Sequence, residues 1–455
     1  MTLALAAAMT GVAPLSGLQA TPTPERPRAT RAVPAYTFLS SMGATSAVSV
    51  RGESLERTIE KVRYTGLRFL RVQQGESNLP DLLTLRRETG VRLSYGIGSG
   101  VSDIESLLRG ARALAAADAL VAIEGPNEPN NWPITYQGRQ GGGSGSWLPV
   151  AELQRDLYRA VNADPVLRRF PVWGTYPGAQ TDNTGLQFLT VPEGAGTLMP
   201  AGTRFADYAK VHNYFVHPNW PSMRDGQPTW PGIHDNQTWR AADPSSACPV
   251  DGLYGHHGLT WLRRFRGYSE AELETLPRVT TETGVTISGP ITEELQARFY
   301  LALYLAQFKR GFRHTAIYLL RDRVDEAGNQ TFGIYRPDNT PRRAAFYLHN
   351  LTTILADDRP IRRPGSLAHS IPDRPETVHD LLLQKRDGTF YLVVWSERLN
   401  VADEVTVNLG RRFASVTIYD PTVGTSPVAT HDGATSVRLS MRHQPLILRL
   451  GRRAP

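Results

Sequence analysis

The chain has 455 residues, of which 40% are hydrophobic, and it contains a single cysteine, Cys248. This length exceeds one ordinary domain and allows a large apolar core, while the lone cysteine excludes an intrachain disulfide and a cysteine-based metal cluster. The formal net charge is +7, from 50 Lys and Arg against 43 Asp and Glu. Because no run of five or more basic residues occurs, we expect no nucleic-acid partner, although a mildly basic surface could favour an acidic polymer.

Residues 1–34 have the pattern of an export segment followed by a linker. The first twenty residues, MTLALAAAMTGVAPLSGLQA, combine a short apolar stretch with a small-residue end, and a Pro- and Thr-rich stretch follows. The pattern resembles a secretory signal, so we expect a secreted or periplasmic protein. No basic residue precedes the apolar run, which leaves open an upstream start or an uncleaved anchor. No later segment approaches 18 continuous apolar residues, so we expect no further membrane span.

Residues 35–357 alternate short apolar runs with amphipathic stretches. Strands are predicted at residues 36–41, 67–73, 92–98, 119–125, 171–177, 208–214, 278–284 and 315–321. Helices are predicted at residues 54–66, 102–116, 292–312 and 341–355, the second with Ser102 as its N-cap. Eight strands alternating with helices predict an α/β fold, the (β/α)8 TIM barrel. A doubly wound open sheet is the alternative, but the chain lacks the expected G-x-G-x-x-G turn.

Residues 358–455 have a different sequence pattern. Short alternating strands are separated by Asp-Gly and Gly-Arg turns, with no helical periodicity. We therefore predict a small C-terminal antiparallel β-sandwich. We expect its only tryptophan, Trp395, to lie in the core, so that the sandwich braces the barrel rather than binding glycan.

Two long insertions rich in Gly, Pro and Trp, residues 137–147 and 217–257, interrupt the barrel pattern. Long loops of a barrel enzyme gather at the C-terminal rim, where the active site lies. Five tryptophans fall in predicted loops: Trp132, Trp147, Trp220, Trp230 and Trp239. Indole rings suit the apolar faces of sugars, so we expect Trp132 and Trp220 to bind a saccharide. Packing of the insertions against the barrel is the alternative.

Three glutamates carry the candidate chemistry. Glu124 and Glu128 lie four residues apart in VAIEGPNEPNN, and Glu282 ends the predicted strand RVTTETG. Side chains at i and i+4 of a strand share a face, so both Glu124 and Glu128 could face the barrel axis. Glu128 lies beyond the strand end and is the better placed for substrate, whereas Glu124 would be buried and would need a partner such as Arg71. Glu128 and Glu282 would form a glycosidase pair.

The sequence Asn127-Glu128-Pro129 after the fourth strand, with Glu282 at the end of the seventh, resembles the clan A glycoside hydrolases, with families 39, 79 and 5 most similar. These are retaining (β/α)8 enzymes. The resemblance implies that Glu128 is the acid/base and Glu282 the nucleophile. It also implies that Asn127 binds the substrate 2-hydroxyl. His212 and Tyr214 match the H-x-Y pattern of the clan, whose tyrosine hydrogen-bonds the nucleophile, and Arg71 resembles its strand-two arginine.

One feature departs from that pattern. Many clan members have a tryptophan at the end of strand eight, where this chain reads IYLLRDR, so we expect Arg321 to pair with Asp322. The histidines at 217, 256 and 257 have no metal-binding spacing, and we expect neither a metal nor a cofactor. The predicted function is a retaining glycoside hydrolase acting on a polysaccharide or oligosaccharide, endo-acting rather than exo-acting. A non-catalytic glycan-binding protein and a transglycosylase are the alternatives.

Overall fold

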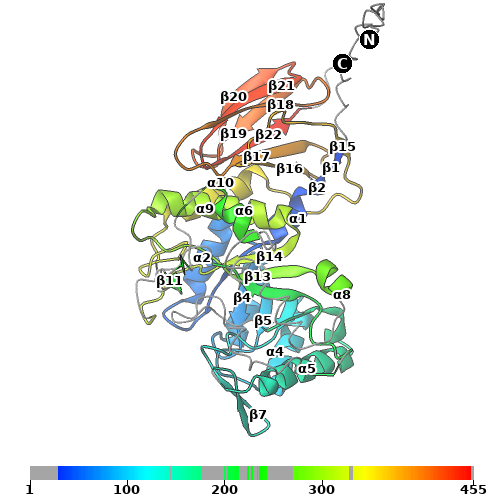
Figure 1. Cartoon of the computed structure of the whole chain (residues 1–455), viewed down its shortest axis with the longest axis vertical. Helices are drawn as coiled ribbons and strands as arrows, with labels where there is room; N and C mark the ends of the chain where they lie inside the picture. The colour runs from blue at the N-terminus through cyan, green and yellow to red at the C-terminus, as the bar shows by residue number, and fades with distance from the viewer. Residues whose placement is uncertain are drawn as a thin grey trace, which may run out of the picture.

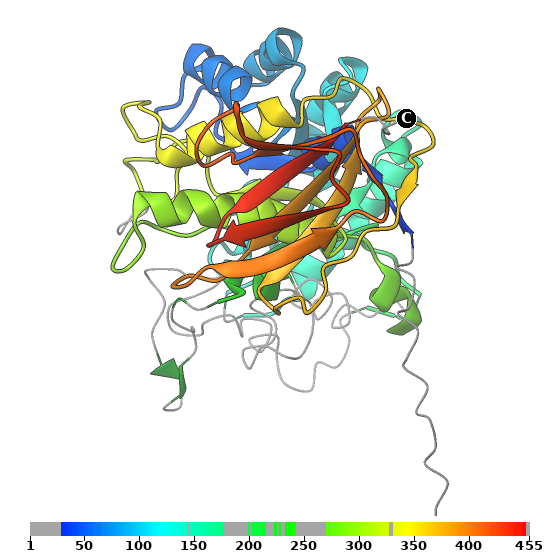
Figure 2. The same ribbon diagram turned by 90° about the horizontal axis from the view of Figure 1, so that it is seen from above.

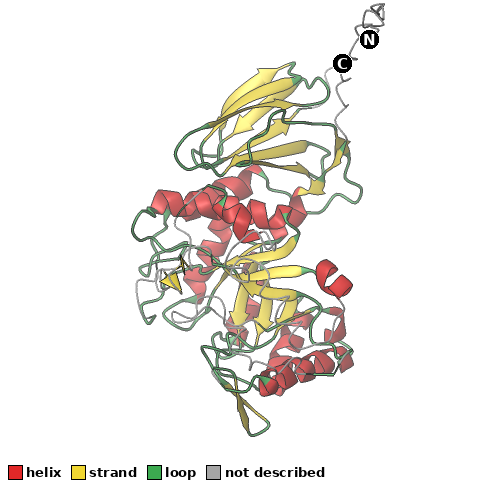
Figure 3. Ribbon diagram, in the orientation of Figure 1, coloured by secondary structure: helices red, strands yellow, loops and turns green. Residues whose placement is uncertain are grey.

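A computed structural model describes residues 29–143, 145–175, 199–200, 202–214, 223–224, 227–228, 233, 235–242, 270–326 and 331–451. A barrel occupies the lower part of the molecule in Figure 1, and antiparallel sheets lie above it across a layer of helices. Figure 3 shows the same arrangement by secondary structure, with the barrel strands between two groups of helices.

Eight parallel strands form the barrel, in the order β10-β13-β14-β3-β4-β5-β6-β9. Their bounds are β3 (Met42–Thr45), β4 (Phe69–Gln73), β5 (Arg92–Gly96), β6 (Leu120–Glu124), β9 (Val172–Trp173), β10 (Ala209–His212), β13 (Arg278–Glu282) and β14 (Phe312–Ile317). The barrel nearly closes between β9 and β10, where Trp173 forms a parallel bridge with Tyr208. The predicted (β/α)8 fold is therefore confirmed.

Helices surround these strands, and sequence signals set several of their ends. They are α1 (Ala35–Ser40), α2 (Leu55–Thr65), α3 (Leu79–Thr89), α4 (Ile104–Ala116), α5 (Leu148–Ala163), α6 (Gln237–Ala242), α8 (Glu270–Thr275), α9 (Glu293–Lys309) and α10 (Arg343–Ile354), with a 3-10 turn at Leu167–Arg169. Ser54 caps α2 at its start, and Gly66 ends it in the left-handed conformation. Asp103 caps α4 by accepting from the Ser106 amide, so the prediction of Ser102 as this cap was wrong by one residue.

The first barrel strand differs from the prediction. Residues 36–41, predicted as a strand, fall in α1 and the turn after it, and the strand follows as the short MGAT segment of β3. Pro34 is the N-cap of α1. Gly43 lies so close to Phe69 that an added Cβ would be 2.3 Å from its ring. Close approach of neighbouring strands therefore selects small residues here, which strand propensity alone does not favour.

The C-terminal sheets pack against the barrel. A six-stranded sheet has the order β2-β16-β17-β22-β19-β20, and β18 pairs separately with β21. The bounds are β16 (Val378–Gln384), β17 (Phe390–Ser396), β18 (Asp403–Asn408), β19 (Ser415–Tyr419), β20 (Pro427–Asp432), β21 (Ser436–Met441) and β22 (Pro445–Leu450). Trp395 is fully buried, as predicted, in a cluster shared with the barrel helices. Figure 2 shows the sheets seen from above, lying over these helices.

The end of the predicted N-terminal linker is paired with the C-terminal sheets. Strand β1 (Thr30–Arg31) pairs with β15 (Ser366–Leu367), and β2 (Val33–Pro34) runs parallel to β16. The chain thus enters the barrel from the C-terminal domain. Two short hairpins complete the described elements: β7 (Ile134–Tyr136) with β8 (Arg139–Gly141), and β11 (Met223–Arg224) with β12 (Gln227–Pro228).

Among the residues that the structure describes, no helix has both the length and the apolar character needed to cross a lipid bilayer. The signal-like first twenty residues lie outside the described residues.

Candidate active site

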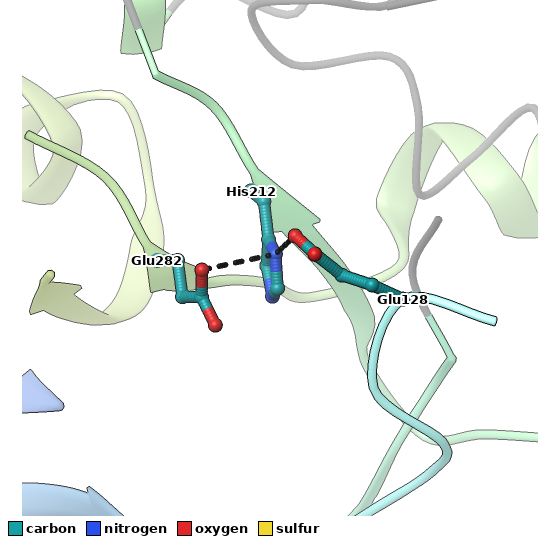
Figure 4. Close-up of side chains that lie close together, drawn as sticks. All are labelled: Glu128, His212 and Glu282. Atoms are coloured by element: carbon teal, nitrogen blue, oxygen red, sulfur yellow. Dashed lines mark hydrogen bonds and ion pairs between the residues drawn. The ribbon is translucent and has the colours of Figure 1, made fainter. Parts of the chain in front are cut away.

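Glu128 and Glu282 meet at the carboxyl end of the barrel strands. Glu282 is the last residue of β13, and Glu128 follows β6 by four residues. Figure 4 shows the two carboxylates on either side of His212, the last residue of β10. One oxygen from each glutamate and one ring nitrogen of His212 all lie within 4.8 Å of one another. Three strands that are distant in sequence therefore converge on one polar cluster.

Glu128 is held by two side chains. Its Oε1 lies 2.7 Å from His212 Nδ1, and its Oε2 accepts a hydrogen bond from Asn131 Nδ2 at 2.9 Å. Its backbone is left-handed, with φ of 41°, so the strand alternation does not continue from Glu124 to this position. Burial raises the pKa of the Glu128 carboxyl, against the hydrogen bond from Asn131 and the positive charge of Arg71. A raised pKa suits a carboxylic acid that must deliver a proton.

Glu282 has two strong donors. Arg71 Nη1 donates to its Oε1, and the Tyr214 hydroxyl donates to its Oε2 at 2.9 Å. His212 Nδ1 lies 3.5 Å from the same Oε2. Burial, reinforced by the negative charge of Glu282, raises the pKa of Tyr214 well above its usual value, so the phenol stays protonated and can donate. These contacts hold both oxygens of the Glu282 carboxylate in place.

Arg71 donates hydrogen bonds to Glu124, Glu282 and Asn127. Only 1% of the residue is exposed. Its Nε donates to Glu124 at 3.1 Å, and its Nη2 donates to the Asn127 side-chain oxygen at 2.6 Å. The predicted burial of Glu124 and its pairing with Arg71 are confirmed. The guanidinium therefore fixes Glu282 and Asn127 relative to each other through planar, directional donors.

A second buried cation, Lys210, was not anticipated from the sequence. Its Nζ lies 3.3 Å from Glu124 Oε2, and both side chains are fully buried. Burial lowers the pKa of Lys210 to about 8. Burial alone would raise the pKa of Glu124, but the charges of Arg71 and Lys210 hold it below its usual value. Lys210 lies two residues before His212 on the same strand face, and this periodicity was the signal available in the sequence.

His212 is neutral between the two acids. Burial lowers its pKa to about 3, against the negative charge of Glu282. Because the ring carries no charge at neutral pH, it does not itself neutralise either glutamate. In the tautomer whose Nδ1 carries no hydrogen, a protonated Glu128 can donate its O–H to this nitrogen at 2.7 Å, which orients the carboxyl group.

The predicted tryptophans have different positions. Trp132 is 53% exposed, and its backbone N–H donates to the Glu128 carbonyl, so it lies on the same turn as Glu128. Trp220 and Trp230 fall outside the described residues. Trp147 is fully buried at the start of α5, and Trp239 stacks on His379 at 4.0 Å. The two latter rings pack the structure, as the alternative interpretation expected.

Strand eight ends differently from the prediction. Arg321 donates to the Pro337 carbonyl, and Asp322 pairs with Arg342, so the expected ion pair between Arg321 and Asp322 does not form. Tyr318, half-buried at the end of β14, lies edge-on to Tyr214 with ring centroids 6.3 Å apart. This strand end therefore has an aromatic ring beside Tyr214, the hydrogen-bond partner of Glu282, where many clan members have a tryptophan.

The donor set of Glu128, His212 and Glu282 is of a kind that binds divalent metals. Glu282, however, already contacts the guanidinium of Arg71, and a metal at the same carboxylate would face that positive charge.

Comparisons with known proteins add the fold relationship. No model of a known protein family matches the chain, and no curated protein matches its sequence. A family 39 glycoside hydrolase from Bacteroides cellulosilyticus WH2 superposes with a TM-score of 0.56 at 14% identity, over 92% of this chain and 81% of that one.

Two further solved structures superpose with a TM-score of 0.50. A family 30 subfamily 8 xylanase from Clostridium acetobutylicum is 10% identical over 94% of this chain and 97% of its own. A family 51 arabinofuranosidase from Xanthomonas axonopodis pv. citri is 12% identical over 86% and 89%. The chain thus has the fold of clan A glycoside hydrolases, which agrees with the resemblance of its motifs.

Proposed function

We propose that this protein is a glycoside hydrolase that cleaves O-glycosidic bonds in a polysaccharide or oligosaccharide. The observation that carries the proposal is the juxtaposition of Glu128 and Glu282, with oxygens within 4.8 Å of each other at the carboxyl end of a TIM barrel. Their environments differ in the way that an acid and a nucleophile require. Burial raises the pKa of Glu128, which favours its protonated form, whereas Glu282 accepts hydrogen bonds from Arg71 and Tyr214.

The short separation favours a retaining double displacement. Retaining enzymes hold their carboxyl groups about 5–5.5 Å apart, whereas inverting enzymes leave about 6.5–9.5 Å for a water molecule. In the first step, Glu282 attacks the anomeric carbon while Glu128 gives its proton to the departing glycosidic oxygen. In the second, Glu128 takes a proton from water, whose oxygen attacks the anomeric carbon and releases Glu282.

The surrounding residues position these two groups. Arg71 and Tyr214 each donate to a different oxygen of Glu282, which fixes the plane of the attacking carboxylate. Asn127 gives its side-chain oxygen to Arg71, and its Nδ2 contacts Ser99 Oγ at 3.2 Å. The second hydrogen of this amide can donate to a sugar hydroxyl, such as the 2-hydroxyl.

We also propose endo action on a chain longer than one sugar. Trp132 supports this, because its exposed indole lies on the rim beside the acid and could stack on a neighbouring sugar unit. An endo enzyme would release a ladder of oligosaccharides early in digestion, and an exo enzyme would release one small product. Export is a separate proposal that rests on the signal-like residues 1–20, and fractionation of cells producing the full chain tests it.

The decisive experiment measures reducing-end release across a panel of neutral and acidic polysaccharides. Wild type is compared with Glu282→Gln, in which any release by co-purified host enzymes would persist, and with Glu88→Gln, the same substitution at an exposed glutamate paired with Arg63. We expect release by wild type and Glu88→Gln that collapses in Glu282→Gln. NMR of the first product then assigns the anomer, and inversion would contradict the double displacement.

Other outcomes select the alternatives. Oligosaccharides longer than the substrate, lost in Glu282→Gln, would identify a transglycosylase. No reducing-end release from any polymer, together with measurable affinity for a glycan of the same panel, would identify a binding protein instead.

A further inference from the structure

A pocket lies outside the barrel wall, between α2 and the loop that leads to α10. Its volume is about 310 Å³, and its walls include Lys61, Tyr64, Tyr335, Asn339 and Phe346. None of the predicted catalytic or substrate-binding residues lines it. In Figure 1, α10 lies between the barrel strands and the C-terminal sheets, and α2 lies below it, level with β14.

Lys61 places a buried ammonium group in the wall of this pocket. The residue is 3% exposed, and its Nζ donates to Asn339 Oδ1 at 2.6 Å. The same nitrogen lies 5.5 Å from the centre of the Tyr335 ring. Within the described part of the chain, no carboxylate lies within 4.0 Å of it, and Glu60, which also lines the pocket, is paired with Arg57 at 2.8 Å. A buried cation without a counter-ion favours the approach of an anion.

The charges that act on Lys61 leave the region positive. Glu53 and Glu60 attract its proton, while Arg57 and Arg321 repel it. With Lys61 itself, these groups carry three positive and two negative charges. Burial lowers the pKa of Lys61 to about 8, so the ammonium persists at neutral pH but is lost in mild alkali.

Aromatic side chains also line the pocket. Phe346 is 45% exposed and lies perpendicular to Tyr64, with ring centroids 6.0 Å apart. Tyr64 is held in place by stacking on His349 at 4.4 Å. Of the exposed large hydrophobic side chains in the described part of the chain, only Trp132 and Phe346 are aromatic. An exposed ring kept beside a pocket suits the apolar face of a sugar.

We propose that this pocket is a second glycan-binding site, which accepts a carboxylate-bearing sugar unit with its carboxylate at Lys61 and its ring against Phe346. The pocket combines one cation, a side-chain amide and aromatic walls, which are the groups that an acidic sugar engages. Such a site would hold an acidic polymer to the outer surface of the barrel. The choice of a glycan rests in part on the proposed function, but binding at this pocket requires no turnover.

The test uses the full chain carrying Glu282→Gln, so that hydrolysis cannot remove the probe. Calorimetry measures affinity for an oligogalacturonate, for its methyl ester of equal length and for inorganic phosphate. Lys61→Met and Phe346→Ala are then added separately to this background. We expect the free acid to bind at least about tenfold more tightly than the ester, as for a charge-assisted hydrogen bond. Lys61→Met should remove this preference, and Phe346→Ala should weaken binding severalfold.

Affinity for the free acid should also fall as the pH rises through about 8, where Lys61 loses its proton. Equal affinity for acid and ester would overturn the assignment of a carboxylate. Phosphate binding as tight as the oligomer would reduce the pocket to a simple anion site. Absence of binding, or binding that neither variant changes, would refute the site itself. Because Phe346 is exposed, Phe346→Ala keeps the test valid if Lys61→Met fails to fold.

Discussion

Replacing Arg71 with methionine tests the centre of the charge arrangement. The change keeps an apolar side chain in the barrel but removes the guanidinium that contacts Glu124, Glu282 and Asn127. Glu124 and Glu282 both lose the charge of Arg71, and Lys210, which lies 3.3 Å from Glu124, remains as a counter-charge for the two carboxylates. Removing one partner of a buried ion pair costs about 3–5 kcal/mol. We expect a loss of this size in the free energy of unfolding for Arg71→Met.

A second substitution separates stability from activity. The double variant Arg71→Met with Glu124→Gln has one buried carboxylate, Glu282, for the one remaining cation, Lys210. Most of the lost unfolding free energy should therefore return. Activity should not return, because Glu282 and Asn127 still lack their donor. Two charge-assisted hydrogen bonds of about 1.5–3 kcal/mol each correspond to a loss of about 10²–10⁴-fold in kcat/KM.

Urea unfolding at pH 7 gives the stabilities of wild type, both single variants and the double variant, and reducing-end release gives their activities. A loss of less than about 1 kcal/mol in the unfolding free energy of Arg71→Met would show that the ion pairs of Arg71 with Glu124 and Glu282 stabilise the fold less than their burial implies. A double variant less stable than Arg71→Met would refute the charge-balance argument. Recovery of activity in the double variant would show that Arg71 acts on catalysis only through Glu124.

Four further predictions concern Glu128, Trp132, Gly125 and the removal of metals. Wild-type kcat/KM should fall as the pH rises through the raised pKa of Glu128, and Glu128→Gln should lose about 10²–10⁴-fold on polymer and no longer show this fall in a pH–rate profile. Trp132→Ala should raise KM for long substrates about 2–10-fold while changing unfolding free energy by less than about 0.5 kcal/mol, because the ring is largely exposed. At Gly125, an added Cβ would lie 1.7 Å from the amide oxygen of a buried glutamine, so Gly125→Ala should destabilise the fold by about 1–3 kcal/mol and lower kcat; unchanged melting and kinetics would contradict this. Dialysis against EDTA should leave activity within about twofold, because the Arg71 cation contacts Glu282; loss that Zn²⁺ or Ca²⁺ restores would establish a metal.

Local signals in the chain predicted several helix ends and strand positions. Gly66 ended a helix as expected, since only a residue that tolerates positive φ closes a helix in this way. Burial of Glu124 and its pairing with Arg71 also followed from the strand pattern, because an interior carboxylate needs a cation. The short strand at Gly43 was missed, since its composition reflects contact with Phe69 rather than strand propensity.

The sequence by itself determined the alternation of strands and helices, and it placed Glu128 and Glu282 at strand ends, because periodicity and turn residues are local properties. Only the tertiary structure decided how these groups meet. The left-handed backbone at Glu128, its contact with His212 and the buried charge of Lys210 arise where distant strands converge. The raised pKa of Glu128 likewise depends on desolvation by the whole barrel, which no local pattern encodes.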